Sequence, residues 1–272
     1  MQVIFDAVRS AMALSFLIYA SWSDYKTREV NDVVWMFFAP AAFALMFAEL
    51  LLYGSVSDLV LYGVCFVVTA AIAVLLFYAG GFGGADSKAL MCLALALPFY
   101  PKNSFTPLSG TVSPISQILF PMTIFSNSVF LVIVPVFWII FRNASWRFRT
   151  KRELFEGTQK NEPIGKKILV LLTGYKIPIK KLKEKWHIYP LEDVEERDDS
   201  HTNVKRKLLI FPKDENRNDI VNRLEKAVTN GTIKDEVWAS PGLPMLIPIT
   251  IGLIVALFLG DIIWSLVSIV LT

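Results

Sequence analysis

Six long apolar runs dominate this chain of 272 residues and decide what it can fold into. They are residues 3–22, 33–53, 59–78, 87–101, 118–141 and 243–271. Five runs reach the roughly 20 residues that a helix needs to cross the hydrocarbon core of a bilayer, and the fourth is shorter, at about 15. The pattern predicts an all-α membrane protein with six transmembrane helices. An alternative for the first run is a cleaved signal peptide, which Asp6 disfavours because such a peptide opens with a basic region.

Charged residues gather between the fifth and sixth runs. Residues 142–238 hold 22 of the 27 Lys/Arg and 16 of the 24 Asp/Glu, so this segment carries a net charge of +6. We therefore expect three parts: residues 1–141 with transmembrane helices 1–5, residues 142–238 as a small mixed α/β soluble insertion, and residues 239–272 with the sixth helix. The basic start of the insertion suits the anionic headgroups of a lipid bilayer.

The insertion itself shows weaker patterns. Residues 168–173 and 207–211 predict short strands, and residues 219–229 have the apolar spacing of a helix. The acidic stretch 192–200 predicts a loop, and its carboxylates could attract a basic peptide.

Lys and Arg in the short connections predict how the helices cross the membrane. Lys26 and Arg28 lie in the first connection, Lys88 follows the third, and a basic cluster begins at Arg142 after the fifth run. The second and fourth connections together carry only Lys102. Connections one, three and five are therefore expected on the cytoplasmic side, with both termini outside.

Few residues are of the types that bind metals or nucleotides. Cys65 and Cys92 each lie inside an apolar run, where small buried hydrophobic residues are expected. His187 and His201 are too few and too widely spaced for a zinc site. The phosphate-binding pattern G-x-x-x-x-G-K-[ST] is absent from the sequence. We expect no metal ion, no cofactor and no nucleic-acid partner, and the oligomeric state stays open.

Two aspartates lie at the first and third connections, which are both expected on the cytoplasmic side. Asp24 follows the first run, and on its own it is typical of a polar loop. Asp86 follows four glycines within five residues and opens the fourth run, where it would also serve as a helix N-cap. Glycines such as Gly83 and Gly84 permit close approach of a peptide backbone or of a second carboxylate.

Taken together, the two aspartates suit the hydrolysis of a peptide bond. One carboxylate would act as general base on a water molecule, and the other would act as acid toward the carbonyl oxygen. Two carboxylates held close together cannot both ionise easily, so such a pair shares a proton. The residues alone do not say whether Asp24 or Asp86 holds it.

The Asp24 segment, the turn from Gly83 to Lys88, the six spans and the soluble insertion resemble the archaeal preflagellin peptidases. That family belongs with the type IV prepilin peptidases and the GxGD membrane aspartyl proteases, and the resemblance extends over essentially the whole chain. It implies that Asp24 and Asp86 are catalytic, with Gly83, Gly84, Ala85 and Lys88 in supporting positions.

The resemblance also implies a substrate, a location and a source. The substrates would be archaellin or type IV pilin-like preproteins, each with a basic leader followed by an apolar helix. Their class III signal peptides would be cut at the cytoplasmic face of the cell membrane of an archaeon. Bacterial relatives often carry cysteine pairs for zinc, which this chain lacks.

One position departs from the family pattern. Ala85 stands where the family has the glycine that precedes the second aspartate. If the position needs a positive φ, alanine is unfavourable; if it needs only a small side chain, alanine suffices. Lys88 would either favour the ionised form of Asp86 or extend to the membrane surface, while Asp32 is expected to cap the second helix.

Two other classes of function compete with the protease. A small proton- or cation-coupled transporter would also use carboxylates at the membrane boundary, although no inverted repeat is visible in the sequence. In a non-catalytic assembly factor, Ala85 would mark lost activity. Asp6, Glu49 and Asp261 are rival carboxylates within or near the spans, and the first two are expected toward the outside.

Overall fold

The computed structural model describes residues 1–195, 205–209, 217–241 and 245–271. The chain divides into two compact units, of which the first comprises Met1–Val132 and Pro244–Thr272 and the second comprises Ile133–Leu243. The expected fold class is confirmed in outline, because the chain is mostly helical and a small sheet region precedes the last helices.

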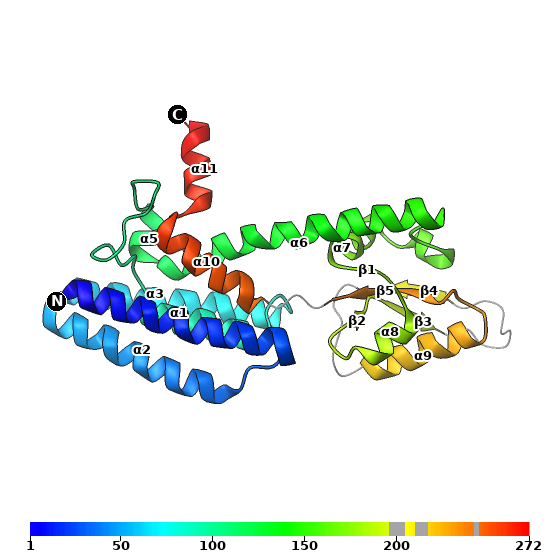
Figure 1. The fold of residues 1–272 in the computed structure, drawn as a ribbon, viewed down its shortest axis with the longest axis horizontal. Coiled ribbons are helices and arrows are strands. Elements are labelled where there is room, and N and C mark those ends of the chain that lie inside the picture. The colour runs from blue at the N-terminus through cyan, green and yellow to red at the C-terminus, as the bar shows by residue number, and fades with distance from the viewer. Residues whose placement is uncertain (196–204, 210–216, 242–244, 272) are drawn as a thin grey trace. The chain divides into compact units, whose positions relative to one another are not determined.

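Helices make up the first unit (Figure 1). They are α1 (Gln2–Thr27), α2 (Asp32–Tyr53), α3 (Val56–Tyr78), α4 (Gly84–Ala96), α5 (Pro114–Ile118), the start of α6 (Phe120–Thr150), α10 (Leu246–Phe258) and α11 (Ile262–Leu271). Among the described residues, α1, α2, α3 and α6 are long and apolar enough to cross a membrane. The bent pair of α10 and α11 adds a fifth span if it counts as one. The chain is therefore a multi-pass membrane protein.

Local signals explain where these helices begin. Asn31 is the N-cap of α2, since its side chain accepts a hydrogen bond of 3.0 Å from the backbone of Val33. At the start of α3, Ser55 and Asp58 form a capping box in which each side chain accepts from the other's backbone N–H. The expectation that Asp32 caps α2 is wrong, because its neighbour Asn31 supplies the oxygen.

The last apolar run is broken, contrary to the single helix expected over residues 243–271. Helices α10 and α11 differ in direction by 56°. Gly260 has a φ of 92°, which a non-glycine residue rarely adopts. Asp261 then accepts a hydrogen bond of 3.0 Å from the backbone of Trp264 and so caps the first turn of α11. The rest of the expected range, residues 243, 244 and 272, lies outside the described residues.

Helix α4 is short, and the other helices of its unit surround it. Its 13 residues span about 20 Å, against roughly 30 Å for the hydrocarbon core. It contacts α1, α2, α3 and α10. Cys92 and Ala94 lie on nearly opposite sides of the helix, and both are buried, as are Leu90 and Ala96. A helix that is apolar on all sides is a buried one, so α4 holds its first turn in a fixed place among longer helices.

The second unit begins within α6, at Ile133, and continues as a small α/β arrangement. Its elements are η1 (Gly157–Asn161), α7 (Ile164–Thr173), β1 (Tyr175–Pro178), α8 (Ile179–Glu184), β2 (Tyr189–Pro190), β3 (Glu192–Glu195), β4 (Lys205–Leu208), α9 (Arg217–Thr229) and β5 (Glu236–Ser240). Strand β5 pairs antiparallel with β1 and β2, and β3 pairs antiparallel with β4. Helix α9 packs its apolar face, with Ile220 and Leu224, into a core that includes Val237 of β5.

Two local predictions for this unit fail and two hold. Residues 168–173, predicted as a strand, belong to helix α7, because the apolar positions continue a helical pattern from Ile164 onward. The acidic stretch predicted as a loop begins with strand β3, while residues 196–200 lie outside the described residues. Helix α9 confirms the helix predicted at 219–229. Strand β4 confirms a strand at 207–208, and residues 210–211 lie outside the described residues.

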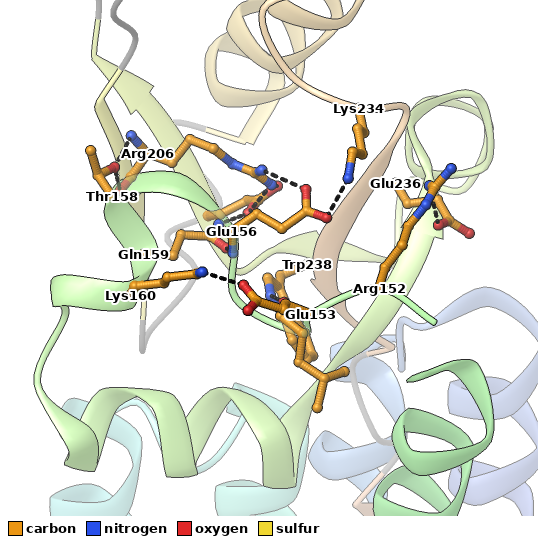
Figure 2. A network of polar contacts seen from close by, with 12 residues as sticks. Arg152, Glu153, Glu156, Thr158, Gln159, Lys160, Arg206, Lys234, Glu236 and Trp238 are labelled. Carbon is orange, nitrogen blue, oxygen red and sulfur yellow. Dashed lines mark hydrogen bonds and ion pairs between the residues drawn. The ribbon is translucent and has the colours of Figure 1, made fainter. Parts of the chain in front are cut away.

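The carboxylates of β3 already have basic partners. Glu192 is fully buried and forms an ion pair of 2.8 Å with Arg206. Arg206 also faces Glu156, which pairs with Lys234, and Figure 2 shows this chain of contacts. Asp193 binds Arg223 at 2.6 Å. These acids therefore stabilise the unit itself, and the described part of the stretch offers little free charge for a basic peptide.

Candidate functional site

Asp24 lies in the last turn of α1, beside the start of α10. Its side chain is half-buried and interacts with the backbone amide of Leu246, the first residue of α10. Helix α1 ends immediately afterwards, because Arg28 adopts a left-handed conformation with φ 60° and donates its N–H to the carbonyl oxygen of Asp24 at 2.9 Å. A carboxylate at a helix N-terminus is stabilised by the partial positive charge there.

Hydrogen bonds between α1 and α10 keep that amide in place. The hydroxyls of Ser21 and Thr250 are 2.7 Å apart and buried. Thr250 also lies within 3.3 Å of the carbonyl oxygen of Leu17, one turn earlier in α1. Because Ser21 precedes Asp24 by three residues and Thr250 follows Leu246 by four, the pair brings the two helix ends together.

Asp86 occupies the third position of α4. Its Oδ2 accepts a hydrogen bond of 2.9 Å from the backbone N–H of Gly83, the N-cap residue. The next residue, Ser87, donates to the carbonyl oxygen of Ala73 in α3 at 3.1 Å, which fixes the start of α4 against that helix. The hydrogen bond from Gly83 thus holds one oxygen of the carboxylate. Asp86 is only 8% exposed, so little of it reaches solvent.

Two of the glycines before Asp86, Gly80 and Gly83, have separate structural reasons to be glycine. Gly80 has a φ of 75°, where a side chain is strained. A Cβ placed on Gly83 would lie 3.2 Å from Oδ2 of Asp86, which is tighter than ordinary van der Waals contact. A Cβ on Gly84 would meet only a ring carbon of Phe77 at 3.9 Å. Gly83 therefore makes room for the carboxylate of Asp86 itself.

Ala85 sits in the second position of α4 and has ordinary helical geometry. Among the described residues, the positive-φ positions other than glycine are Arg28 and Lys151. Ala85 is partly buried and packs against the core of its unit. The family glycine at this position is therefore not required by the backbone of this chain, and a small side chain satisfies the packing.

The structure brings the two aspartates into electrostatic contact. Burial is the main cause that raises the pKa of Asp86 to about 7, and the nearby charge of Asp24 raises it further, while the hydrogen bond from Gly83 lowers it. A pKa near 7 means that Asp86 keeps a proton under conditions where an ordinary aspartate is ionised. The arrangement is one carboxylic acid beside one more exposed carboxylate.

Lys88 lies outside this pair. Its ammonium forms an ion pair of 2.5 Å with Asp32 at the start of α2, and both side chains are exposed. The lysine thus links α4 to α2 and does not contact Asp86 directly. Sequence reasoning missed Asp32 as the partner of Lys88. The signal in the sequence was a lysine and an aspartate at the ends of two runs on the same expected side.

The rival carboxylates have structural partners elsewhere. Asp6 and Glu49 both pair with the buried Arg9, at 2.6 and 2.7 Å. Asp6 precedes Asp24 by 18 residues of the same helix, which corresponds to about 27 Å. Asp261 accepts from Ser113 at 2.9 Å besides capping α11.

The residue types that ligate metal ions do not cluster in the parts of the chain that the structure describes. No group of three His, Cys, Asp or Glu side chains is close enough there to hold an ion. Cys65 and Cys92 are free and buried in α3 and α4. Sequence reasoning missed the contribution of Leu246, because its backbone amide carries no side-chain signal and lies more than two hundred residues from Asp24.

These helices and this site define a multi-pass membrane protein that holds two neighbouring carboxylates, each beside a helix N-terminus. A family model described as the type IV leader peptidase family matches residues 11–139. A second model, described as the archaeal peptidase A24 C-terminus, type II, matches residues 166–262. The two models together match most of the chain, which is therefore similar to the type IV leader peptidase family over most of its length, with an archaeal type of C-terminal part.

Curated relatives agree over nearly the full length. A preflagellin peptidase of Methanococcus maripaludis is 25% identical over 250 residues, which cover 90% of this chain and 92% of that protein. A preflagellin peptidase of Methanococcus voltae is 26% identical over 265 residues, covering 94% and 97%. One from Methanocaldococcus jannaschii is 24% identical over 251 residues, covering 90% and 91%.

Proposed function

We propose that this chain is an aspartyl endopeptidase that removes the leader peptide from preflagellin-like preproteins, with Asp24 and Asp86 as its catalytic pair. The observation that supports the proposal is that the charge of Asp24, in α1, acts on the carboxyl group of Asp86, in α4, in a chain that matches the leader peptidase family. The names of the three relatives support preflagellins as the substrate class.

The two environments suggest a division of labour. Asp24 is the more exposed, and we assign it the ionised form that removes a proton from a water molecule. Asp86 is the more buried, and it donates its proton to the carbonyl oxygen of the scissile bond as the water oxygen attacks the carbon. The two macroscopic pKa values belong to the pair as a unit.

The second half of the reaction restores both groups. The C–N bond breaks as the proton held by Asp24 moves to the leaving nitrogen. Asp86 recovers a proton from a hydroxyl of the tetrahedral intermediate, which becomes the new carboxylic acid. One water molecule is consumed, and the enzyme returns to its starting protonation state without any cofactor.

The substrate class accounts for the position of the site near helix ends. A basic leader followed by an apolar helix would place its scissile bond where the helix leaves the bilayer. Lys26 and Arg28 beside Asp24, and the basic cluster that begins at Arg142, support the cytoplasmic face as the side of cleavage. We propose six membrane segments, with the short α4 as the fourth and the bent α10–α11 pair as the sixth.

The direct test uses the full-length protein in liposomes and a synthetic preflagellin precursor. Mass spectrometry of the products should reveal one cut, between the basic leader and the apolar helix, and a chelator should not change the rate. Asp32→Asn is a matched control on an exposed aspartate, and it should cut at the same bond. An intact precursor, or cuts scattered over the chain, would contradict the proposed function.

A further inference from the structure

Helix α7 exposes apolar side chains on one face while it buries others. Its inner face includes Val170, which is fully buried in a cluster with Leu208 and Trp238. On its outer face, Ile164, Ile168 and Leu169 are 74%, 49% and 41% exposed. Ile164 and Ile168 are four apart and lie on one side of the helix, and Leu169 is adjacent to Ile168, so the three form one exposed surface, which we call the α7 stripe.

One buried side chain of α6 fixes the position of α7 along the axis of α6. Asn143 of α6 donates from Nδ2 to the carbonyl oxygens of Leu171 and Gly174, at 3.1 and 2.8 Å. These two acceptors lie at the C-terminal end of α7. The helix is therefore fastened to α6 at the level of Asn143.

Asn143 lies where α6 leaves the hydrocarbon. The apolar run that forms the membrane part of α6 ends at Phe141, and the basic segment begins at Arg142. The helix has 31 residues, about 46 Å, so roughly ten residues extend beyond a core of about 30 Å. The fastening point of α7 thus coincides with the membrane surface.

Aromatic and basic residues at that level are typical of a membrane interface. The guanidinium of Arg142 lies 5.3 Å from the ring centre of Trp138 and 3.6 Å from that of Tyr175, which follows α7 after Gly174. Tryptophan is enriched where the acyl chains meet the headgroups, and Trp138 is 53% exposed, whereas the buried Tyr175 holds Arg142 at this level. Both rings lie within the same unit as α7.

The charge around α7 specifies the kind of lipid. Residues 142–173 contain eight Lys/Arg and three Asp/Glu. On α7 itself, Lys166 pairs with Glu162 at 3.1 Å, and Lys167 binds the carbonyl oxygen of Lys160. The excess of positive charge favours anionic headgroups, each basic residue near the surface adding to the attraction.

We propose that α7 lies in the membrane interface, with the α7 stripe among the lipids of an anionic surface, and that it holds the soluble unit at the bilayer. An amphipathic helix with basic residues and exposed isoleucine and leucine suits such a position. The proposal concerns the second unit alone and does not depend on the peptidase activity.

The test labels single cysteines in the full-length protein with an environment-sensitive fluorophore. Cys65 and Cys92 are first replaced by alanine, and Ile168→Cys and Ile164→Cys then report on the α7 stripe. Asn222→Cys, on the exposed polar face of α9, is the matched control. The proteins are placed in phosphatidylcholine vesicles that contain phosphatidylglycerol, some of whose lipids carry a nitroxide quencher near the glycerol end of the acyl chain.

The proposal predicts blue-shifted emission at positions 168 and 164, with quenching severalfold stronger than at position 222. Emission at position 168 that matches the control would overturn it. A blue shift without quenching by lipid would also overturn it, because protein would then cover the stripe. Quenching that does not fall when phosphatidylglycerol is omitted would overturn the assignment to an anionic surface.

Discussion

Replacing Gly83 with alanine tests how closely the protein holds Asp86. The new Cβ would lie 3.2 Å from Oδ2 of Asp86, so the carboxylate must withdraw by a few tenths of an ångström from the place where Gly83 donates to it at 2.9 Å. The backbone at Gly83, with φ −74° and ψ 164°, accepts alanine without strain. The effect is therefore confined to the position of the carboxylate.

The size of the effect follows from the bond that is weakened. A hydrogen bond to a neutral carboxylic acid contributes about 0.5–1.5 kcal/mol, and losing half of it corresponds to roughly twofold to threefold in an equilibrium. Misplacing a reacting group can cost more, up to about a hundredfold for 1 Å. For a displacement of a few tenths of an ångström we expect the cleavage rate of Gly83→Ala to fall by about threefold to tenfold.

The matched control is Ala85→Gly, two positions along the same turn. It restores the glycine of the family pattern in a helix, at a cost in stability of up to about 1 kcal/mol. Its cleavage rate should stay close to that of the wild type. Initial rates on a preflagellin precursor, with thermal unfolding of both variants, make the comparison. Full activity in Gly83→Ala, or an equal loss in Ala85→Gly, would refute this reasoning.

Four further predictions follow from single residues and contacts. Cleavage should fall as the pH rises through about 7, because Asp86 then loses its proton; a flat pH–rate profile from 5 to 9 would contradict this. Because the pKa of Asp86 is raised in the folded protein, the free energy of unfolding should fall by about 4 kcal/mol as the pH rises from 3.8 to 7. Asp86→Asn should remove this dependence of the unfolding free energy on pH in detergent unfolding experiments. Thr250→Val removes the bond to Ser21 and should cost about 1 kcal/mol of unfolding free energy and slow cleavage, so an unchanged rate would count against a role for the contact between α1 and α10. Glu192→Gln leaves the buried Arg206 with only its longer contact to Glu156 and should cost about 3–5 kcal/mol in calorimetry, whereas a neutral result would show that the ion pair is not structural.

Much of the fold was accessible from the sequence because membrane spans depend on composition over long windows. The runs at 3–22 and 118–141 correspond to α1 and α6. The short fourth run is the short helix α4, whose burial reflects its lack of a polar face. The placement of Asp24 and Asp86 on one side also required only the basic residues in the connections.

The remaining features depend on short or distant signals. The run at 168–173 is apolar and brief, and such a run is compatible with either a strand or a buried helix. The bend at Gly260 depends on one residue within a run that otherwise suits a single span. The amide of Leu246 beside Asp24 results from the packing of α10 on α1, which no local pattern encodes. The pairing of Lys88 with Asp32 likewise depends on tertiary structure.

The central claim is that Asp24 and Asp86 act as one catalytic unit, and the direct measurement is the cleavage rate of both single variants and the double variant. Asp24→Asn and Asp86→Asn should each reduce cleavage of a preflagellin precursor by at least about a thousandfold, and the double variant should lose little more, because residues that act together are not additive. Asp32→Asn should cleave like the wild type. Substantial cleavage by either single variant, in protein that remains folded, would contradict the claim.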